Sequence, residues 1–259
     1  MALDYVMHIR SESARFLEVL RGADPSARVP SCPDWDAEDL LWHLTEVQAF
    51  WAQLVELRAR ARHEVPDVSR PGSPDEIASA FSEWSERLAV ALEVTADDVG
   101  VWTWTADQSV GFVRRRQAHE ALIHRLDAEL TTGRITPLPS DLAADGAREA
   151  LEVMYGACPR WGTFTPDGRG LVVSCTDTDD SVEVSLGRFT GTDPSDGTTH
   201  DEPDISVRRL THEPDARISG PASDLDSWLW HRRNDRGLSF EGSPEVLDAV
   251  RGILRQPID

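Results

Sequence analysis

The chain has 259 residues and a mass of 28.7 kDa, enough for one large domain or two of ordinary size. Its 46 acidic residues against 26 basic ones give a formal net charge of -20, which repels phosphate backbones and excludes nucleic acid as a partner. No run approaches the ~20 consecutive apolar residues of a membrane-spanning helix. The N-terminal sequence MALDYVMHIR also lacks the basic-then-apolar order of a signal peptide. We therefore expect a cytoplasmic globular protein with no membrane partner.

Two features of the composition limit the chemistry further. All 26 basic residues are arginine, so mechanisms that need a Schiff-base lysine or the lysine of a phosphate-binding loop are excluded. The three cysteines, Cys32, Cys158 and Cys175, are odd in number and far apart. This pattern favours a reducing compartment and argues against a disulfide framework or a cysteine-rich zinc site.

The first half of the sequence has the apolar periodicity of long helices. Asp36 and Ser73 precede two of these segments, and both side chains suit the N-cap position. Modest connections between helices are typical of an antiparallel four-helix bundle. The four predicted helices span residues 4–21, 37 to about 63, 74–93 and 110–130.

The second half changes to a mixed pattern. One more helix is predicted over 141–156, and short alternating segments then predict strands. The acidic stretch 176–204 predicts a strand pair followed by a long solvated loop. We therefore expect an α+β protein, with a helix bundle over 1–158 and a smaller α/β domain over 159–259. The remaining predicted elements are strands at 171–174, 182–186, 205–208, 216–219 and 238–240, and helices at 222–233 and 244–254.

Three side chains in the predicted bundle have the pattern of a metal site. Glu120 and His124 are four residues apart, which places both on one helix face with Cβ atoms about 6 Å apart. His43 lies in the middle of another apolar helix, in LLWHLTEV. In an antiparallel bundle, a histidine of one helix can meet such a Glu/His pair of another and form an open three-ligand site. Two imidazoles and one carboxylate suit zinc or another divalent first-row metal.

Other polar residues near these candidates have alternative roles. His119 points about 100° away from Glu120 around the helix, which favours a supporting or interface role over metal ligation. Asp127 either accepts a hydrogen bond from His124 or forms a surface salt bridge. The arginines at 114–116 meet either the acidic surface or a substrate carboxylate, and the acidic surface is favoured.

The segments VPSCPDWDAEDLLWHL and RRRQAHEALIHRLDAE resemble the two signature segments of the mycothiol-dependent maleylpyruvate isomerase family. The N-terminal part of that family is a DinB-like helix bundle. The later segment ISGPASDLDSWLWHRR is similar to the family's smaller α/β C-terminal domain, which resembles a sterol-carrier-type fold. The resemblance implies that His43, Glu120 and His124 bind a divalent metal, normally zinc, and that mycothiol is a cofactor.

The resemblance also implies a reaction. In the family's isomerase, the thiolate adds to a cis enedioate, rotation follows about the resulting single bond, and elimination returns the trans isomer. The C-terminal domain supplies an arginine that suits a dicarboxylate, and Arg232 occupies the best-matching position here. Where the family usually has glycine before that arginine, this chain has His231.

The leading hypothesis is therefore a metal- and mycothiol-dependent isomerase of a small unsaturated (di)carboxylic acid such as maleylpyruvate. A mycothiol S-transferase acting on an electrophilic small molecule is the first alternative, because it omits only the elimination step. A non-catalytic metal- or ligand-binding module is another alternative. Metal-assisted hydrolysis needs a carboxylate base that no sequence feature indicates. The expected partners are a small-molecule substrate and a low-molecular-weight thiol, and the expected state is a monomer or small homo-oligomer.

Overall fold

A computed structural model describes residues 3–256 and 258 of the chain. The chain forms two compact units, one ending at Pro137 and the other beginning at Leu138. The division lies earlier than the sequence-based boundary after residue 158, because the helix that follows Pro139 packs against a helix of the second unit. The first unit is helical and the second combines a sheet with helices, which confirms the α+β class.

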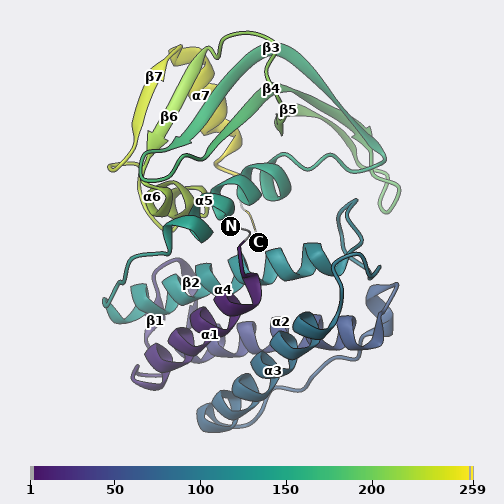
Figure 1. Ribbon diagram of the computed structural model, residues 1–259, viewed down its shortest axis with the longest axis vertical. Coiled ribbons are helices and arrows are strands. Elements are labelled where there is room, and N and C mark those ends of the chain that lie inside the picture. Colours follow the sequence, from purple (N-terminus) through teal and green to yellow (C-terminus); the bar gives the residue numbers. More distant parts are fainter. Residues whose placement is uncertain (1–2, 257, 259) are drawn as a thin grey trace. The chain divides into compact units, whose positions relative to one another are not determined.

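Among the described residues of the first unit, four α-helices form the main part, and each begins close to its predicted start (Figure 1). Side chains cap all four N-termini: Asp4, Asp36, Ser73 and Ser109 each accept a hydrogen bond from a backbone N–H of the first turn. Helix α1 packs against α3 and α4, and α2 also packs against both. The bounds are α1 (Tyr5–Arg21), α2 (Ala37–Leu57), α3 (Pro74–Val94) and α4 (Val110–Thr132).

Helix α2 ends six residues before its predicted end near residue 63. Arg58 adopts a left-handed conformation with φ of 52°, and its N–H bonds back to the helix. The next N–H, that of Ala59, donates to the Leu54 carbonyl at 3.0 Å and completes the helix terminus. A separate 3-10 turn, Arg62–Glu64, follows. The apolar periodicity alone did not reveal this local turn.

A short hairpin precedes α2, in a part of the sequence for which no strand was predicted. Strand β1 (Arg28–Val29) pairs antiparallel with β2 (Cys32–Asp36). The turn between the strands contains Ser31, and β2 leads directly into the capped start of α2.

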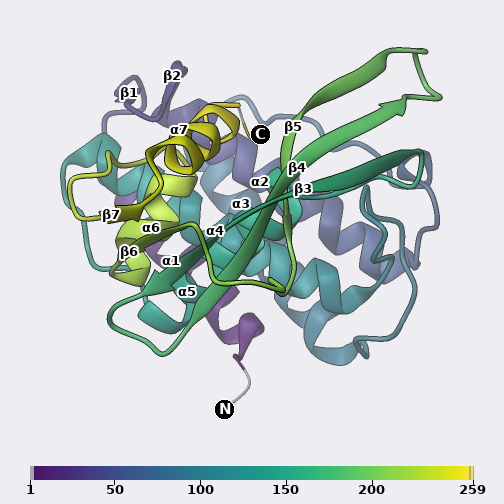
Figure 2. The same cartoon turned by 90° about the horizontal axis from the view of Figure 1, so that it is seen from above.

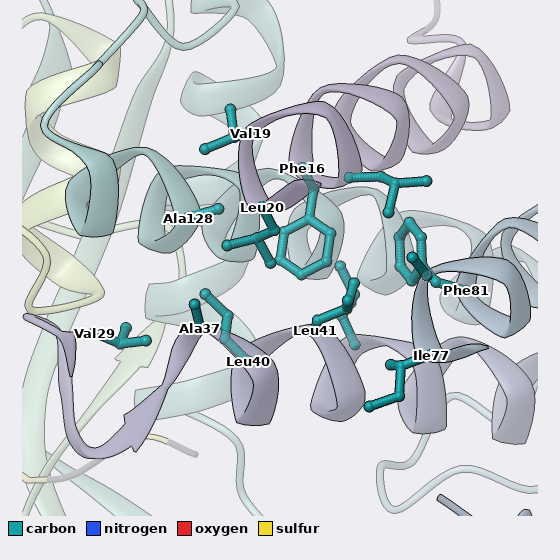
Figure 3. Close-up of a cluster of buried hydrophobic side chains, with 13 residues drawn as sticks. Phe16, Val19, Leu20, Val29, Ala37, Leu40, Leu41, Ile77, Phe81 and Ala128 are labelled. Atoms are coloured by element: carbon teal, nitrogen blue, oxygen red, sulfur yellow. The ribbon is translucent and has the colours of Figure 1, made fainter. Parts of the chain in front are cut away.

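Aromatic and aliphatic side chains from all four helices and from β1 form a buried cluster in the first unit (Figure 3). Phe16 of α1 and Phe81 of α3 lie with ring centroids 5.1 Å apart, and both are buried. Leu40 and Leu41 of α2 pack in the same cluster. This packing fixes α2, which carries His43, within the bundle.

The second unit contains a five-stranded sheet with strand order β5-β4-β3-β6-β7. Strands β3 and β6 pair in parallel and the other neighbours pair antiparallel. In Figure 2, β3, β4 and β5 extend as long arrows beyond the shorter β6 and β7. The bounds are β3 (Gly162–Cys175), β4 (Ser181–Thr192), β5 (Thr199–Val207), β6 (Ala216–Gly220) and β7 (Ser239–Gly242).

Three helices belong to this unit: α5 (Ser140–Glu149), α6 (Ala222–Leu229) and α7 (Pro244–Ile253). Helix α5 is followed by a π-helical turn, Ala150–Tyr155, so the helix predicted over 141–156 is irregular in its second half. Helix α6 ends at Leu229 rather than 233. The long loop predicted within the acidic stretch 176–204 is also wrong. The last residues of that stretch belong to strand β5, which pairs with β4.

Within the described part of the chain, no helix has both the length and the apolar character needed to cross a lipid bilayer.

Candidate metal centre

The three predicted ligands lie together in the first unit. His43 comes from α2, and Glu120 and His124 come from adjacent turns of α4. One ligand atom from each residue lies within 4.8 Å of the other two. His43 Nε2 is 3.8 Å from Glu120 Oε1, and His124 Nε2 is 3.1 Å from the same oxygen. Sequence separation between the helices is large, so only the packing of α2 against α4 creates this arrangement.

A hydrogen-bonded chain orients His124. Its Nδ1 donates to Asp127 Oδ2 at 3.0 Å, which directs Nε2 toward Glu120. Asp127 is fully buried, and Ser31 Oγ of the hairpin turn donates to its Oδ1 at 2.5 Å. Of the two roles predicted for Asp127, the structure therefore shows the hydrogen bond to His124. The role of Ser31 was missed, because no local pattern links it to a residue 96 positions later.

Arg116 holds the other oxygen of Glu120. Its Nη2 donates to Glu120 Oε2 at 3.1 Å, while Oε1 faces the two histidines. The Arg116 side chain is only 3 % exposed, so the surface role favoured from the sequence is wrong for this arginine. By contrast, Arg114 pairs with Asp97 and donates to the carbonyls of Leu92 and Thr95. The four-residue spacing from Arg116 to Glu120 was the signal that could have identified this contact.

Burial and charge act in opposite directions on the two ligands of α4. Burial by itself lowers the pKa of His124, but the carboxylates of Asp127 and Glu120 raise it to about 9. Burial by itself raises the pKa of Glu120, but its contacts with His124 and His43 and the charge of Arg116 hold that pKa well below its usual range. Glu120 is therefore an anion at neutral pH, as a metal ligand must be.

His43 is the most accessible of the three ligands. Its side chain is 31 % exposed, compared with 20 % for Glu120 and 9 % for His124. The Trp35 ring of β2 lies 4.6 Å from the His43 ring, and the His124 ring lies 4.8 Å away in an edge-on orientation. The two imidazoles thus lie against each other and Trp35 covers one of them.

The donors fit a divalent first-row metal. Two imidazole nitrogens and one carboxylate oxygen form the ligand set of many open zinc sites, and His124 has the carboxylate partner that such ligands usually have. Among the described residues, these three form the group of His, Cys, Asp and Glu side chains that could hold a metal. His119 is absent from the group: it is buried, with its ring 6.3 Å from that of Tyr5.

Arg232, the predicted substrate-binding residue, lies in the second unit just after α6. Its N–H donates to the Ser227 carbonyl at 2.8 Å, and the His231 N–H donates to Trp228 at 3.0 Å. These two bonds form a Schellman motif, which requires a left-handed residue at the position of His231. His231 indeed has φ of 60°.

The left-handed turn explains why glycine suits this position, and side-chain contacts hold the histidine there instead. His231 Nε2 donates to the Leu254 carbonyl at 2.5 Å and lies 3.3 Å from Tyr155 Oη. Tyr155 in turn donates to the Leu229 carbonyl at 2.7 Å. Burial raises the pKa of Tyr155, and the positive charge of Arg232 opposes this rise.

Comparisons with known proteins agree with this description. The family model for the mycothiol maleylpyruvate isomerase N-terminal domain matches residues 6–129. The crystal structure of the mycothiol-dependent maleylpyruvate isomerase is similar, with a TM-score of 0.57 at 15% identity over 93% of both chains. A mutant form of that protein gives a TM-score of 0.56 at the same identity and coverage. No curated protein shows significant sequence similarity to the chain. Residues 6–129, which contain the whole His43/Glu120/His124 group, therefore belong to the mycothiol maleylpyruvate isomerase N-terminal domain family, and the chain has the fold of the mycothiol-dependent isomerase.

Proposed function

We propose that this chain is a metal- and mycothiol-dependent enzyme that isomerises a small unsaturated (di)carboxylic acid such as maleylpyruvate, the thiol adding to the double bond and then leaving it. The observation that carries the proposal is the convergence of His43, Glu120 and His124 within 4.8 Å, inside a domain of this family. The solved isomerase, at 15% identity, supports the proposal through its fold, and the turnover experiment below identifies the substrate.

In this proposal the ligands are His43, Glu120 and His124. A divalent cation held there, with zinc favoured by this donor set, supplies a positive charge that lowers the pKa of a coordinated thiol. The catalytic contribution of the protein is then to hold this charge in a fixed place and to leave one side open to small molecules. The partial exposure of His43 and Glu120 supports such an opening.

The surrounding residues prepare the ligands. Asp127 accepts a hydrogen bond from His124 Nδ1, so Nε2 is the nitrogen directed at Glu120 and the one that coordinates a cation once it has lost its proton. Arg116 occupies Glu120 Oε2, which leaves Oε1 as the atom directed at the histidines. The positive charge of Arg116 also offsets the negative charge of Glu120, and this favours the binding of an anionic thiolate.

Arg232 is proposed to bind a substrate carboxylate. A guanidinium is always charged at physiological pH and pairs with a carboxylate through two parallel hydrogen bonds. The Schellman motif fixes the backbone of Arg232, which limits the entropy lost when the side chain engages a ligand.

The metal content of purified protein is the first test. We expect one equivalent of metal in the wild type and none in a triple variant, His43→Ala, Glu120→Ala and His124→Ala. The matched control carries the same three substitution types at exposed positions, His63→Ala, Glu18→Ala and His212→Ala, and should keep its metal. Metal retention by the first variant, or no metal in the wild type after reconstitution, would contradict the proposed site.

Turnover is the second test, and its product identifies the reaction. With maleylpyruvate and mycothiol we expect the trans isomer to accumulate while the free thiol concentration stays constant. Stoichiometric consumption of thiol with formation of a thioether would instead identify an S-transferase. A metal-loaded protein that turns over neither maleylpyruvate nor other unsaturated acids in the presence of mycothiol would support the alternative of a non-catalytic metal- or ligand-binding module.

A further inference from the structure

The two histidines of the metal centre are supported in different ways. His124 has a carboxylate partner, since its Nδ1 donates to Asp127 Oδ2 at 3.0 Å. In the part of the chain that the structure describes, no side chain forms a hydrogen bond with Nδ1 of His43. Its Nε2 lies 3.8 Å from Glu120 Oε1, which is beyond hydrogen-bond distance. The ring orientation of His43 therefore depends on packing.

Aromatic rings supply that packing. The Trp35 ring centroid lies 4.6 Å from that of His43, with the two planes inclined by 42°. The His124 ring lies 4.8 Å from the His43 ring on its own contact, with an interplanar angle of 75°. An aromatic ring at such a distance excludes the imidazole rotamers that would overlap it. Because the His43 side chain is 31 % exposed, loss of the indole would open those rotamers to solvent.

Trp35 is itself fixed by the hairpin that carries it. Strand β2 pairs with β1, and the Trp35 side chain is partly buried against the hydrophobic cluster to which Val29 and Ala37 belong (Figure 3). The strand ends at Asp36, whose capping box begins α2. Backbone pairing and the helix cap therefore hold both sides of Trp35.

The same hairpin also reaches the other histidine. Ser31, in the turn between β1 and β2, donates to Asp127, which orients His124. The hairpin thus contacts one imidazole directly through Trp35 and supports the other through a chain of two hydrogen bonds. Helices α2 and α4 supply the ligands, and the hairpin connects to both of the histidines among them.

We propose that Trp35 is a positioning residue of the metal centre, which holds the His43 imidazole in the orientation that directs Nε2 toward Glu120. This role rests on the proposed function, in which His43 binds the metal. Trp35 acts through His43 and supplies no ligand atom. A ligand that is already oriented loses less conformational freedom when the metal binds, so removal of the indole should weaken metal binding without abolishing it.

Nuclear magnetic resonance of the metal-free full chain tests the orientation directly. Trp35→Leu keeps an apolar side chain against the cluster but removes the aromatic ring. The wild type should show a nuclear Overhauser effect between the ring protons of His43 and His124, because the two rings are in contact. This effect should weaken in Trp35→Leu, where the His43 ring samples other rotamers, and should persist in Trp35→Phe.

Zinc affinity measures the consequence for the metal. Trp35→Leu should bind zinc about tenfold more weakly than the wild type, and Trp35→Phe should stay within about twofold of it, because phenylalanine restores an aromatic contact. The visible spectrum of the cobalt-substituted protein reports the coordination geometry. It should change in Trp35→Leu and return toward that of the wild type in Trp35→Phe.

Trp84→Leu is the matched control. Trp84 is also partly buried in the first unit, and its ring contacts Arg87 at 4.1 Å rather than a metal ligand. This variant should have a lower melting temperature and the zinc affinity of the wild type. Thermal melting confirms that each variant is folded, and Trp35→Met replaces Trp35→Leu if the smaller side chain unfolds the protein.

The outcomes separate this role from the proposed function. An unchanged Overhauser effect or an unchanged zinc affinity in Trp35→Leu would overturn the role of Trp35, as would an equal loss of affinity in Trp84→Leu or Trp35→Phe. The proposed function stands in each of these cases if the wild type binds metal. A wild type that binds no metal would overturn the proposed function, and a weaker Overhauser effect in metal-free Trp35→Leu would still identify Trp35 as the residue that orients His43.

Discussion

The imidazole of His124 and the carboxylate of Asp127 lie 3.0 Å apart on successive turns of α4, and both side chains are buried. A histidine that binds a metal through one ring nitrogen needs a partner for the other, and a carboxylate in this place fixes both the tautomer and the ring orientation. Asp127 is itself held by Ser31. The geometry of the metal centre therefore extends from α4 to the hairpin before α2.

Replacing Asp127 should weaken the metal site without removing a ligand. We expect Asp127→Asn to lower zinc affinity about 10- to 100-fold, because the neutral amide no longer stabilises the correct tautomer of His124. Ser31→Ala should act in the same direction with a smaller effect. Competition with a fluorescent zinc chelator measures both. Asp67→Asn is the control, since that side chain is 86% exposed and pairs with Arg62; equal losses in the control and in Asp127→Asn would argue against the role given to Asp127.

A second buried network should stabilise the bundle and leave the metal site unchanged. Arg125 Nε donates to Glu12 at 2.7 Å and Nη1 donates to Glu129 at 2.9 Å, with all three side chains almost fully buried. Arg125→Met leaves two buried carboxylates without this partner, and we expect it to cost about 3 kcal/mol in the free energy of unfolding.

Urea denaturation and metal analysis check this prediction together. The matched control is Arg87→Met, which removes an exposed pair with Glu56 and should cost under about 1 kcal/mol. Similar losses in the free energy of unfolding for the two variants would show that burial does not strengthen the contribution of the Arg125 network to stability.

The left-handed backbone at His231 predicts an unusual order of stabilities. In His231→Ala the side chain loses its bond to the Leu254 carbonyl and the strained φ of 60° remains. In His231→Gly the same bond is lost but the strain is relieved, so the glycine variant should be more stable than the alanine variant by about 1 kcal/mol. Arg58, with φ of 52° at the end of α2, should show the same order. The urea midpoints of the alanine and glycine variants at each position measure this order. An alanine variant as stable as the glycine variant would show that the left-handed backbone is not strained.

Asp204 of β5 should make the stability of the folded protein depend on pH. Burial raises its pKa from 3.8 to about 6, although the Ile205 N–H donates to its carboxylate. The pKa of Asp204 is higher in the folded state than in the unfolded state, so protonation of this group stabilises the fold. This stabilisation is fully present below pH 3.8 and is lost as the pH rises through about 6. Asp204→Asn cannot ionise and should be more stable than the wild type at pH 8 by about 1 kcal/mol after solvent screening is allowed for.

The stability difference should disappear near pH 4, where Asp204 of the wild type is protonated. Asp193→Asn is a control of opposite sign, because hydrogen bonds from Ser195 lower the pKa of Asp193 and its charged form is the favoured one. Thermal melting of the three proteins from pH 4 to pH 8 measures these differences. A stability gain for Asp204→Asn that does not change with pH would have another cause.

The sequence by itself determined the helices of the bundle. It also determined that Glu120 and His124, two of the three proposed metal ligands, lie on the same face of one helix. Helix formation depends on hydrogen bonds and side chains within a few residues, so the caps at Asp36 and Ser73 and the Glu120/His124 spacing were visible in the sequence. His43 joined this pair through the assumption of an antiparallel bundle and through a family resemblance, and the packing of α2 against α4 confirmed that the three lie together.

Only the tertiary structure decided the contacts that join distant segments. Ser31 reaches Asp127 across 96 positions, and β5 forms where the acidic composition predicted a loop because pairing with β4 outweighs local propensity. The burial of Arg116 and the exposure of Arg236 have the same origin. An arginine has the same side chain in either setting, and whether it meets a carboxylate or remains available for a ligand depends on which chain segments fold around it.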